Sequence, residues 1–129
     1  MIVVDCAALV DALGAAPDTD ALRQRLSGQE LHAPTLIDYE FVSALRGMML
    51  RRAVDDPLAN DMLHDFEDLP IRRWPSTDGM RRRALGLRDC VSAYDASYVA
   101  LAEVLECPLV TRDKRLARAA GHGAQIEAF

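Results

Sequence analysis

Two short runs of continuous apolar residues, far apart in the sequence, most strongly constrain how this chain can fold. The chain begins MIVVD, and residues 107–111 read CPLVT. Continuous apolar runs, as opposed to alternating ones, are typical of strands that are buried on both faces of a parallel sheet. Weaker strand patterns occur at ELHAP (30–34), PIRRW (70–74) and AQIEAF (124–129). The sequence therefore predicts a central sheet with at least two fully buried strands.

Helical patterns separate these predicted strands. Strands joined through long helices pair in parallel, through right-handed crossovers. A chain of 129 residues is long enough for one domain with a single core. We therefore expect one domain over residues 1–129, a three-layer α/β/α sandwich with a central, mostly parallel sheet. The predicted helices cover residues 6–14, 18–26, 35–53, 56–69, 77–87, 92–106 and 113–121.

Charge and composition exclude several classes of protein. The net charge is −5, with one lysine among 15 basic residues, so bulk positive charge cannot bind a nucleic acid. A polyanionic substrate would need an arginine cluster or a bound divalent metal. No stretch approaches the roughly 20 apolar residues of a membrane span, and the N-terminus lacks the pattern of a signal peptide. Three cysteines without C-x-x-C spacing favour free thiols. These features predict a cytoplasmic protein without membrane association.

Four acidic residues from distant parts of the chain lie where the predicted fold would bring them together. Asp5 directly follows the first strand, and Asp113 follows LVT by one residue. Asp95 lies in the first turn of the apolar helix 92–106, and Glu40 lies between Tyr39 and Phe41 on the helix 35–53. Active sites of parallel α/β sheets gather beyond the carboxyl ends of the strands. The four acids are therefore candidates for one site.

Each acid also has a purely structural interpretation. Asp5 and Asp113 can cap the helices that follow them. Ser92-x-x-Asp95 fits a capping box, and so does Thr35-x-x-Asp38, for which capping is the favoured interpretation. Glu40 can simply be exposed on a polar stripe of its helix. Taken one at a time, these interpretations are the more common ones.

Taken together, the structural interpretations become weaker. Carboxylates gathered at one edge of a sheet repel one another, and burying them without a partner is costly. A hard cation such as Mg²⁺ or Mn²⁺ would relieve this repulsion, since both prefer carboxylate and water oxygens. Such ions held by carboxylates are a common apparatus for hydrolysing phosphodiester bonds. They would also present positive charge to a phosphate on an acidic protein.

The segments IVVD, APTLIDYEFVSALR, SAYDASYVALAE and PLVTRDKRLARAAG resemble, in this order and over nearly the whole chain, the PIN-domain family and specifically the VapC-type toxins of toxin–antitoxin pairs. By this resemblance the acidic cluster of the family falls on Asp5, Glu40, Asp95 and Asp113. Asp5 and Asp95 would be the direct metal ligands, and the other two acids would complete the cage or orient its waters. Thr111 matches the hydroxyl residue of a T-x-D element and would hydrogen-bond an acid.

The resemblance implies an endoribonuclease that depends on Mg²⁺ (or Mn²⁺), forms homodimers and is inhibited by a small antitoxin protein. Arg46 and Arg112 are the candidates for phosphate contacts, because guanidinium groups pair well with phosphate. With Thr111 they form the predicted substrate-binding set. One departure from the family pattern is Cys6, where a serine or threonine is frequent. Losing that hydroxyl would affect metal affinity.

Two alternative functions stay open on the sequence alone. A phosphohydrolase or receiver-like domain could use Asp5 on a similar sheet, but the second aspartate of that signature is absent, since alanine stands at Ala7. A PIN-like module that binds RNA or protein without catalysis is the alternative from another class. The intact set of four acids favours catalysis over such a module.

Overall fold

Five parallel strands in the order β3-β2-β1-β4-β5 form the central sheet of the computed structural model, which describes residues 1–129. All four neighbouring pairs of strands are parallel, which confirms the predicted parallel sheet. Val3 lies at its centre, in register with His32 of β2 on one side and with Leu109 of β4 on the other. The strands are β1 (Ile2–Val4), β2 (Leu31–Pro34), β3 (Ile71–Trp74), β4 (Leu109–Thr111) and β5 (Ile126–Ala128).

Burial explains why the strands differ in sequence. Every residue of β1, β2 and β4 is buried, in keeping with their position inside the sheet. The edge strands carry polar residues instead: β3 exposes Arg72, and β5 has no fully buried residue. Edge strands are covered on fewer sides, so they tolerate charge that a central strand would exclude.

Seven helices surround the sheet, and all of them were predicted. The helix predicted over 35–53 begins later than expected, because Thr35 does not cap it. Its N-cap is Leu36, without a side-chain hydrogen bond, and Asp38 instead accepts a hydrogen bond from Arg73 at 2.7 Å. The prediction of a capping box at Thr35-x-x-Asp38 is therefore wrong. The helices are α1 (Cys6–Leu13), α2 (Asp20–Leu26), α3 (Ile37–Leu50), α4 (Asp56–Asp68), α5 (Asp78–Gly86), α6 (Ala93–Leu105) and α7 (Lys114–Arg118).

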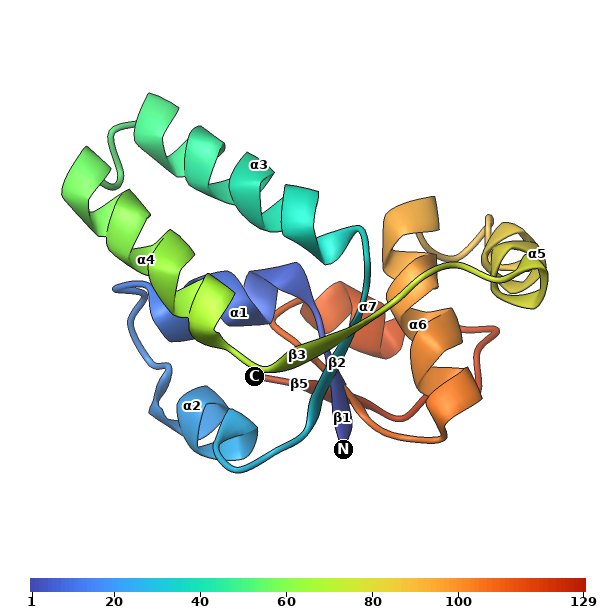
Figure 1. The fold of residues 1–129 in the computed structure, drawn as a ribbon. Helices are drawn as coiled ribbons and strands as arrows, with labels where there is room; N and C mark the ends of the chain where they lie inside the picture. Colours follow the sequence, from blue (N-terminus) through green and yellow to red (C-terminus); the bar gives the residue numbers. More distant parts are fainter.

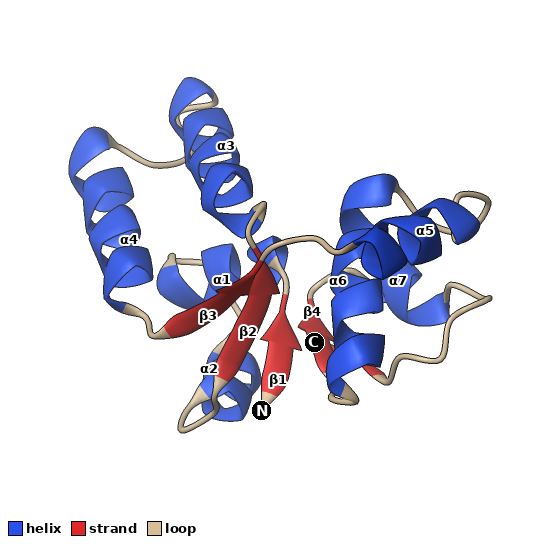
Figure 2. Cartoon of the chain, turned by 45° about the vertical axis from the view of Figure 1, so that its right-hand side comes forward, coloured by secondary structure: helices blue, strands red, loops and turns tan.

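The helices form layers on both sides of the sheet, as Figure 2 shows. Helix α6 packs on β1, β2 and β4, with α5 against its outer side, while α1 packs on β4 and contacts α2, α3 and α4. Phe41 of α3 stacks on Phe66 of α4 with their ring centroids 4.2 Å apart, which joins these two helices. The predicted three-layer α/β/α fold is confirmed. None of the helices is long and apolar enough to cross a bilayer, and all three cysteines are free.

The strand order reverses direction next to β1. From β1 the chain builds outward to β2 and β3, and it then returns to add β4 and β5 on the other side of β1 (Figure 1). Connections on either side of such a reversal diverge and leave a crevice at the carboxyl ends of the two strands. Asp5 and Thr111 lie at this point, at the ends of β1 and β4.

Candidate active site

A cavity of about 970 Å³ lies at the carboxyl edge of the sheet, where α1, α3, α6 and α7 begin. All four predicted acids line it. Asp5 and Asp113 are the N-caps of α1 and α7, while Glu40 and Asp95 lie in the first turns of α3 and α6. The structure therefore brings together four residues that are spread over the whole chain. Four helix N-termini, with their partial positive charges, face the same carboxylates.

Asp5 is the most buried of the acids, with 8% of its surface exposed. Its Oδ1 accepts a hydrogen bond from the backbone amide of Ala8 at 2.8 Å, which is the predicted helix cap. Its Oδ2 accepts a hydrogen bond from the hydroxyl of Thr111. Burial raises the pKa of Asp5 from 3.8 to about 6, against the effect of these two hydrogen bonds, and the charges of Asp95 and Glu40 add to the rise.

Glu40 accepts a hydrogen bond from a buried tyrosine that was not predicted from the sequence to be part of the site. The hydroxyl of Tyr98, on α6, donates a hydrogen bond to Oε1 of Glu40 at 2.6 Å. Burial raises the pKa of Glu40, the charge of Asp95 raises it further, and the hydrogen bond from Tyr98 partly opposes both. The alternative that Glu40 is merely solvent-exposed is wrong, because the residue is half-buried and faces the other acids.

Asp113 and Asp95 complete the set. The carboxylate of Asp113 accepts a hydrogen bond from the backbone amide of Arg115 at 2.8 Å. Partial burial alone would raise the pKa of Asp113, but the hydrogen bonds from the amide and side chain of Arg115 outweigh it and lower the pKa. The backbone amide of Asp95 donates to the hydroxyl of Ser92 at 3.1 Å, as a capping box requires. Asp113 therefore both caps α7 and lines the cavity, whereas at α6 Ser92 supplies the cap and the carboxylate of Asp95 only lines the cavity.

The donor set fits a hard divalent cation. The charge of Asp95 contributes to the raised pKa values of Asp5 and Glu40, and the only cationic side chain that lines the cavity is Arg51. With these side-chain positions, no group of three acidic, histidine or cysteine residues is arranged to hold a metal ion. Asp5 and Glu40 keep free lone pairs beside the hydrogen bonds that they accept from Thr111 and Tyr98, since a carboxylate has about four acceptor positions. A cation could therefore draw the acids together without breaking the bonds from Thr111 and Tyr98.

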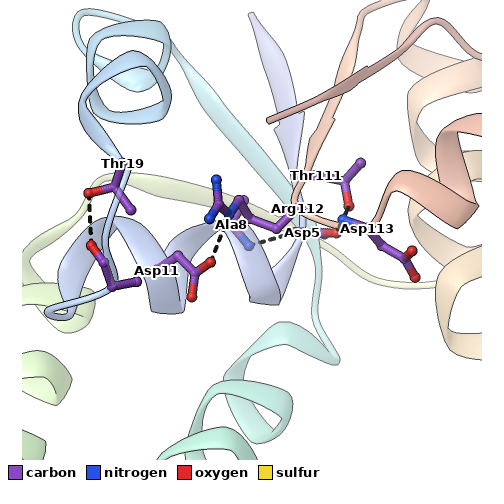
Figure 3. A network of polar contacts seen from close by, with 8 residues as sticks. Asp5, Ala8, Asp11, Thr19, Thr111, Arg112 and Asp113 are labelled. Atoms are coloured by element: carbon purple, nitrogen blue, oxygen red, sulfur yellow. Dashed lines mark hydrogen bonds and ion pairs between the residues drawn. The ribbon is translucent and has the colours of Figure 1, made fainter.

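The predicted substrate-binding residues lie in different surroundings. Thr111 is completely buried, so it lies behind Asp5 and does not reach the substrate. Its hydroxyl also accepts a hydrogen bond from the backbone amide of Asp113 at 2.9 Å, and one side chain thereby orients two of the acids (Figure 3). Nε of Arg112 donates to Asp11 at 2.8 Å, and Arg46 is exposed outside the cavity lining. The phosphate contacts of Arg46 and Arg112 stay predictions.

Tyr98, Asp11 and Cys6 also line the cavity, and the pattern of acids in the sequence did not predict them as part of the site. Tyr98 could not be found by pattern, because it reads as one more apolar residue of a buried helix. Burial and the charges of Glu40 and Asp5 raise the pKa of the Cys6 thiol to about 12. Cys6 is therefore a neutral thiol here and adds no negative charge to the cluster.

Ligand sites of parallel α/β sheets lie at such a reversal point, and a cavity lined with carboxylates there is suited to a divalent ion that acts on a phosphodiester. Residues 2–122 match the PIN domain. The chain belongs to the PIN-domain family.

Comparison with individual proteins shows which group within the PIN-domain family this chain is similar to. The chain is 40% identical to Ribonuclease VapC12 of Mycobacterium tuberculosis over 127 residues, which cover 98% of each protein. Its fold is similar to that of FitAcB from Neisseria gonorrhoeae, with a TM-score of 0.71 at 14% identity over 98% of this chain and 96% of the other. It is also similar to M. tuberculosis VapC20, a sarcin-ricin loop cleaving toxin, with a TM-score of 0.68 at 14% identity over 95% and 97% of the two chains. Within the family, the chain is of the VapC type.

Proposed function

We propose that this chain, a VapC-type toxin endoribonuclease, hydrolyses RNA phosphodiester bonds with Mg²⁺ or Mn²⁺ bound in the acidic cavity. The observation that carries the proposal is that Asp5, Glu40, Asp95 and Asp113 line one cavity that contains a single cationic side chain. Full-length similarity to proteins named VapC ribonucleases supports RNA as the substrate. It also favours an enzyme over a non-catalytic binding module.

The four acids have two different parts in this proposal. Asp5 and Asp95 would hold the ion, and Glu40 and Asp113 would complete its surroundings and orient water. When bound, such an ion supplies positive charge beside the phosphate and lowers the pKa of a water. Thr111 and Tyr98 keep Asp5 and Glu40 in place through their hydroxyl groups. No protein nucleophile is needed.

The test is to incubate the purified protein with total cellular RNA in Mg²⁺, in Mn²⁺ and in a chelator, beside an Asp95→Asn variant. We expect discrete RNA fragments with either metal and none with the chelator, because carboxylates alone cannot neutralise the phosphate. Asp95→Asn keeps the size of the side chain but removes one ligand charge. If wild type with metal cuts no more than this variant does, the proposed activity is wrong.

The partner proteins form a second part of the proposal. We expect a small cognate antitoxin to bind the chain, and the chain to form a homodimer in the cytoplasm, where its proposed substrate is found. Expression of the tagged chain together with its neighbouring genes should therefore co-purify a second, smaller protein, visible by mass spectrometry. A chain that purifies alone, as a monomer, and does not slow growth when expressed would contradict the toxin assignment.

A further inference from the structure

Two exposed tyrosines stand at the mouth of the acidic cavity. Tyr39 is 83% exposed and Tyr94 is 68% exposed, and both line the cavity. They are the only aromatic residues among the exposed large apolar side chains of the molecule. The third tyrosine, Tyr98, is buried beneath Glu40. Exposure on this scale leaves the ring faces of Tyr39 and Tyr94 without a protein partner.

Each ring belongs to a residue that is the chain neighbour of one of the cavity acids. Tyr39 directly precedes Glu40 in the first turn of α3, and Tyr94 directly precedes Asp95 in the first turn of α6. Figure 2 shows the starts of these two helices beyond the end of β1, with α3 on the left and α6 on the right. A polynucleotide whose phosphate reaches the acids would therefore have one ring available on each side of the phosphate.

Charge makes base contacts more important here than in most RNA-binding sites. Five carboxylates line the cavity, from Asp5, Asp11, Glu40, Asp95 and Asp113, and Arg51 is the only basic residue of the lining. Two further arginines, Arg112 and Arg115, are paired with Asp11 and Asp113 from outside the lining. Phosphate contacts from basic residues usually supply much of the affinity for nucleic acids. With few basic residues in the lining, stacking of bases on aromatic rings is a further source of affinity, and it tolerates any sequence.

Arg51 lies at the far end of α3 from Tyr39 and indicates along which side of the cavity a bound RNA strand would run. It follows the last residue of α3, about 18 Å along the helix from Tyr39. Its guanidinium lies 3.1 Å from the position that a Cβ on Gly47 would occupy, and both residues line the cavity. The bare surface at Gly47 thus lets Arg51 lie against α3 on the cavity side.

We propose that Tyr39 and Tyr94 bind two unpaired bases by stacking, one on each side of the phosphate held at the acids, and that Arg51 contacts a phosphate further along the same strand. This inference rests on the proposed function, and it adds the form of the substrate. Bases stacked inside a duplex have no free faces, so the site takes an unpaired segment of RNA. Tyr39 and Tyr94 are binding residues and take no part in the chemistry.

Binding and cleavage must be measured separately to test this. Binding is measured as the anisotropy of a labelled single-stranded oligoribonucleotide in chelator, where no cleavage occurs, and cleavage as kcat and KM with metal. We expect Tyr39→Ala and Tyr94→Ala each to raise Kd and KM about 5- to 30-fold, with kcat nearly unchanged. Tyr39→Phe and Tyr94→Phe keep the ring and should bind like wild type. Arg51→Gln should reduce the salt slope of log Kd by about 0.7.

Several results would overturn the inference. Alanine variants that bind the oligonucleotide like wild type would do so, as would phenylalanine variants that lose as much affinity as the alanine variants. A change in oligomeric state or antitoxin binding at unchanged Kd would assign the tyrosines to a protein interface instead. Asp95→Asn separates the two proposals, because it should bind RNA normally without cutting it. Wild-type protein that binds but does not cut would overturn the activity and leave the tyrosine assignment standing.

Discussion

Replacing Asp5 by asparagine is expected to abolish cleavage and at the same time to stabilise the metal-free protein. Cleavage should fall at least about 100-fold in kcat/KM, because the variant loses a buried charge that a divalent ion needs. Asparagine keeps the shape of the side chain, and its oxygen can still accept the hydrogen bond from Ala8. The loss of activity would therefore come from the loss of charge and not from a damaged helix cap.

The gain in stability follows from the raised pKa of Asp5, which is about 6 in the folded protein against an ordinary value of 3.8. Between about pH 4 and 6 the folded state binds more protons than the unfolded state, so the contribution of Asp5 to stability falls as the pH rises. Above pH 6 that loss is complete and amounts to at most about 3 kcal/mol. The Asp5→Asn variant avoids this cost.

Urea unfolding in chelator at pH 4 and pH 7.5 measures this difference. We expect the variant to unfold at higher urea than wild type at pH 7.5, and the two proteins to converge near pH 4. Added Mg²⁺ should raise the melting temperature of wild type and leave that of the variant nearly unchanged. A variant that is less stable than wild type at pH 7.5 would show that the carboxylate of Asp5 is not electrostatically strained.

Replacing Thr111 by valine is expected to lower kcat/KM by about 10- to 100-fold, although Thr111 does not touch the substrate. Valine has nearly the same shape, but it removes the hydrogen bond to Asp5 and the acceptor for the amide of Asp113. Residues that orient metal ligands in this way commonly have effects of that size. The hydroxyl lowers the pKa of Asp5, so its removal should raise that pKa and move the acid limb of the pH profile of kcat/KM upward.

Thr111→Ser is the matched control, because it keeps the hydroxyl and loses only a methyl group. It should retain most of the activity and the pH profile of wild type. The measurement is kcat/KM from pH 5.5 to 8.5 for wild type and both variants. Equal rates and equal pH profiles for valine and serine would mean that the hydroxyl has no part in positioning the acids.

The sequence was a good guide to the elements and to the acids for a physical reason. Burial of β1 and β4 on both faces favours uninterrupted apolar runs, so each of these strands could be recognised from its own residues alone. Asp5 and Asp113 each follow such a strand, and the carboxyl ends of parallel strands meet at one edge. Their convergence with Glu40 and Asp95 was therefore expected from the order of the elements and from the family resemblance.

Other features could not be predicted because they depend on the packing of distant segments. The motif Thr35-x-x-Asp38 fits a helix cap, but in the folded chain Asp38 forms an ion pair with Arg73 of β3 instead. Arg112 reads as a phosphate-binding residue, yet it pairs with Asp11, which is 101 residues away. The local sequence does not determine which of two possible hydrogen-bonding partners will lie closer to a side chain after folding.

The sequence by itself determined the parallel α/β architecture and the four acids, because both follow from local hydrophobic patterns and from the position of each acid beside its strand or helix. Only the tertiary structure decided the strand order, the support of Glu40 by Tyr98 and of Asp5 by Thr111, and the exposure of Tyr39 and Tyr94 at the cavity. These contacts join residues that are far apart along the chain, and their geometry is set by how the helices pack on the sheet.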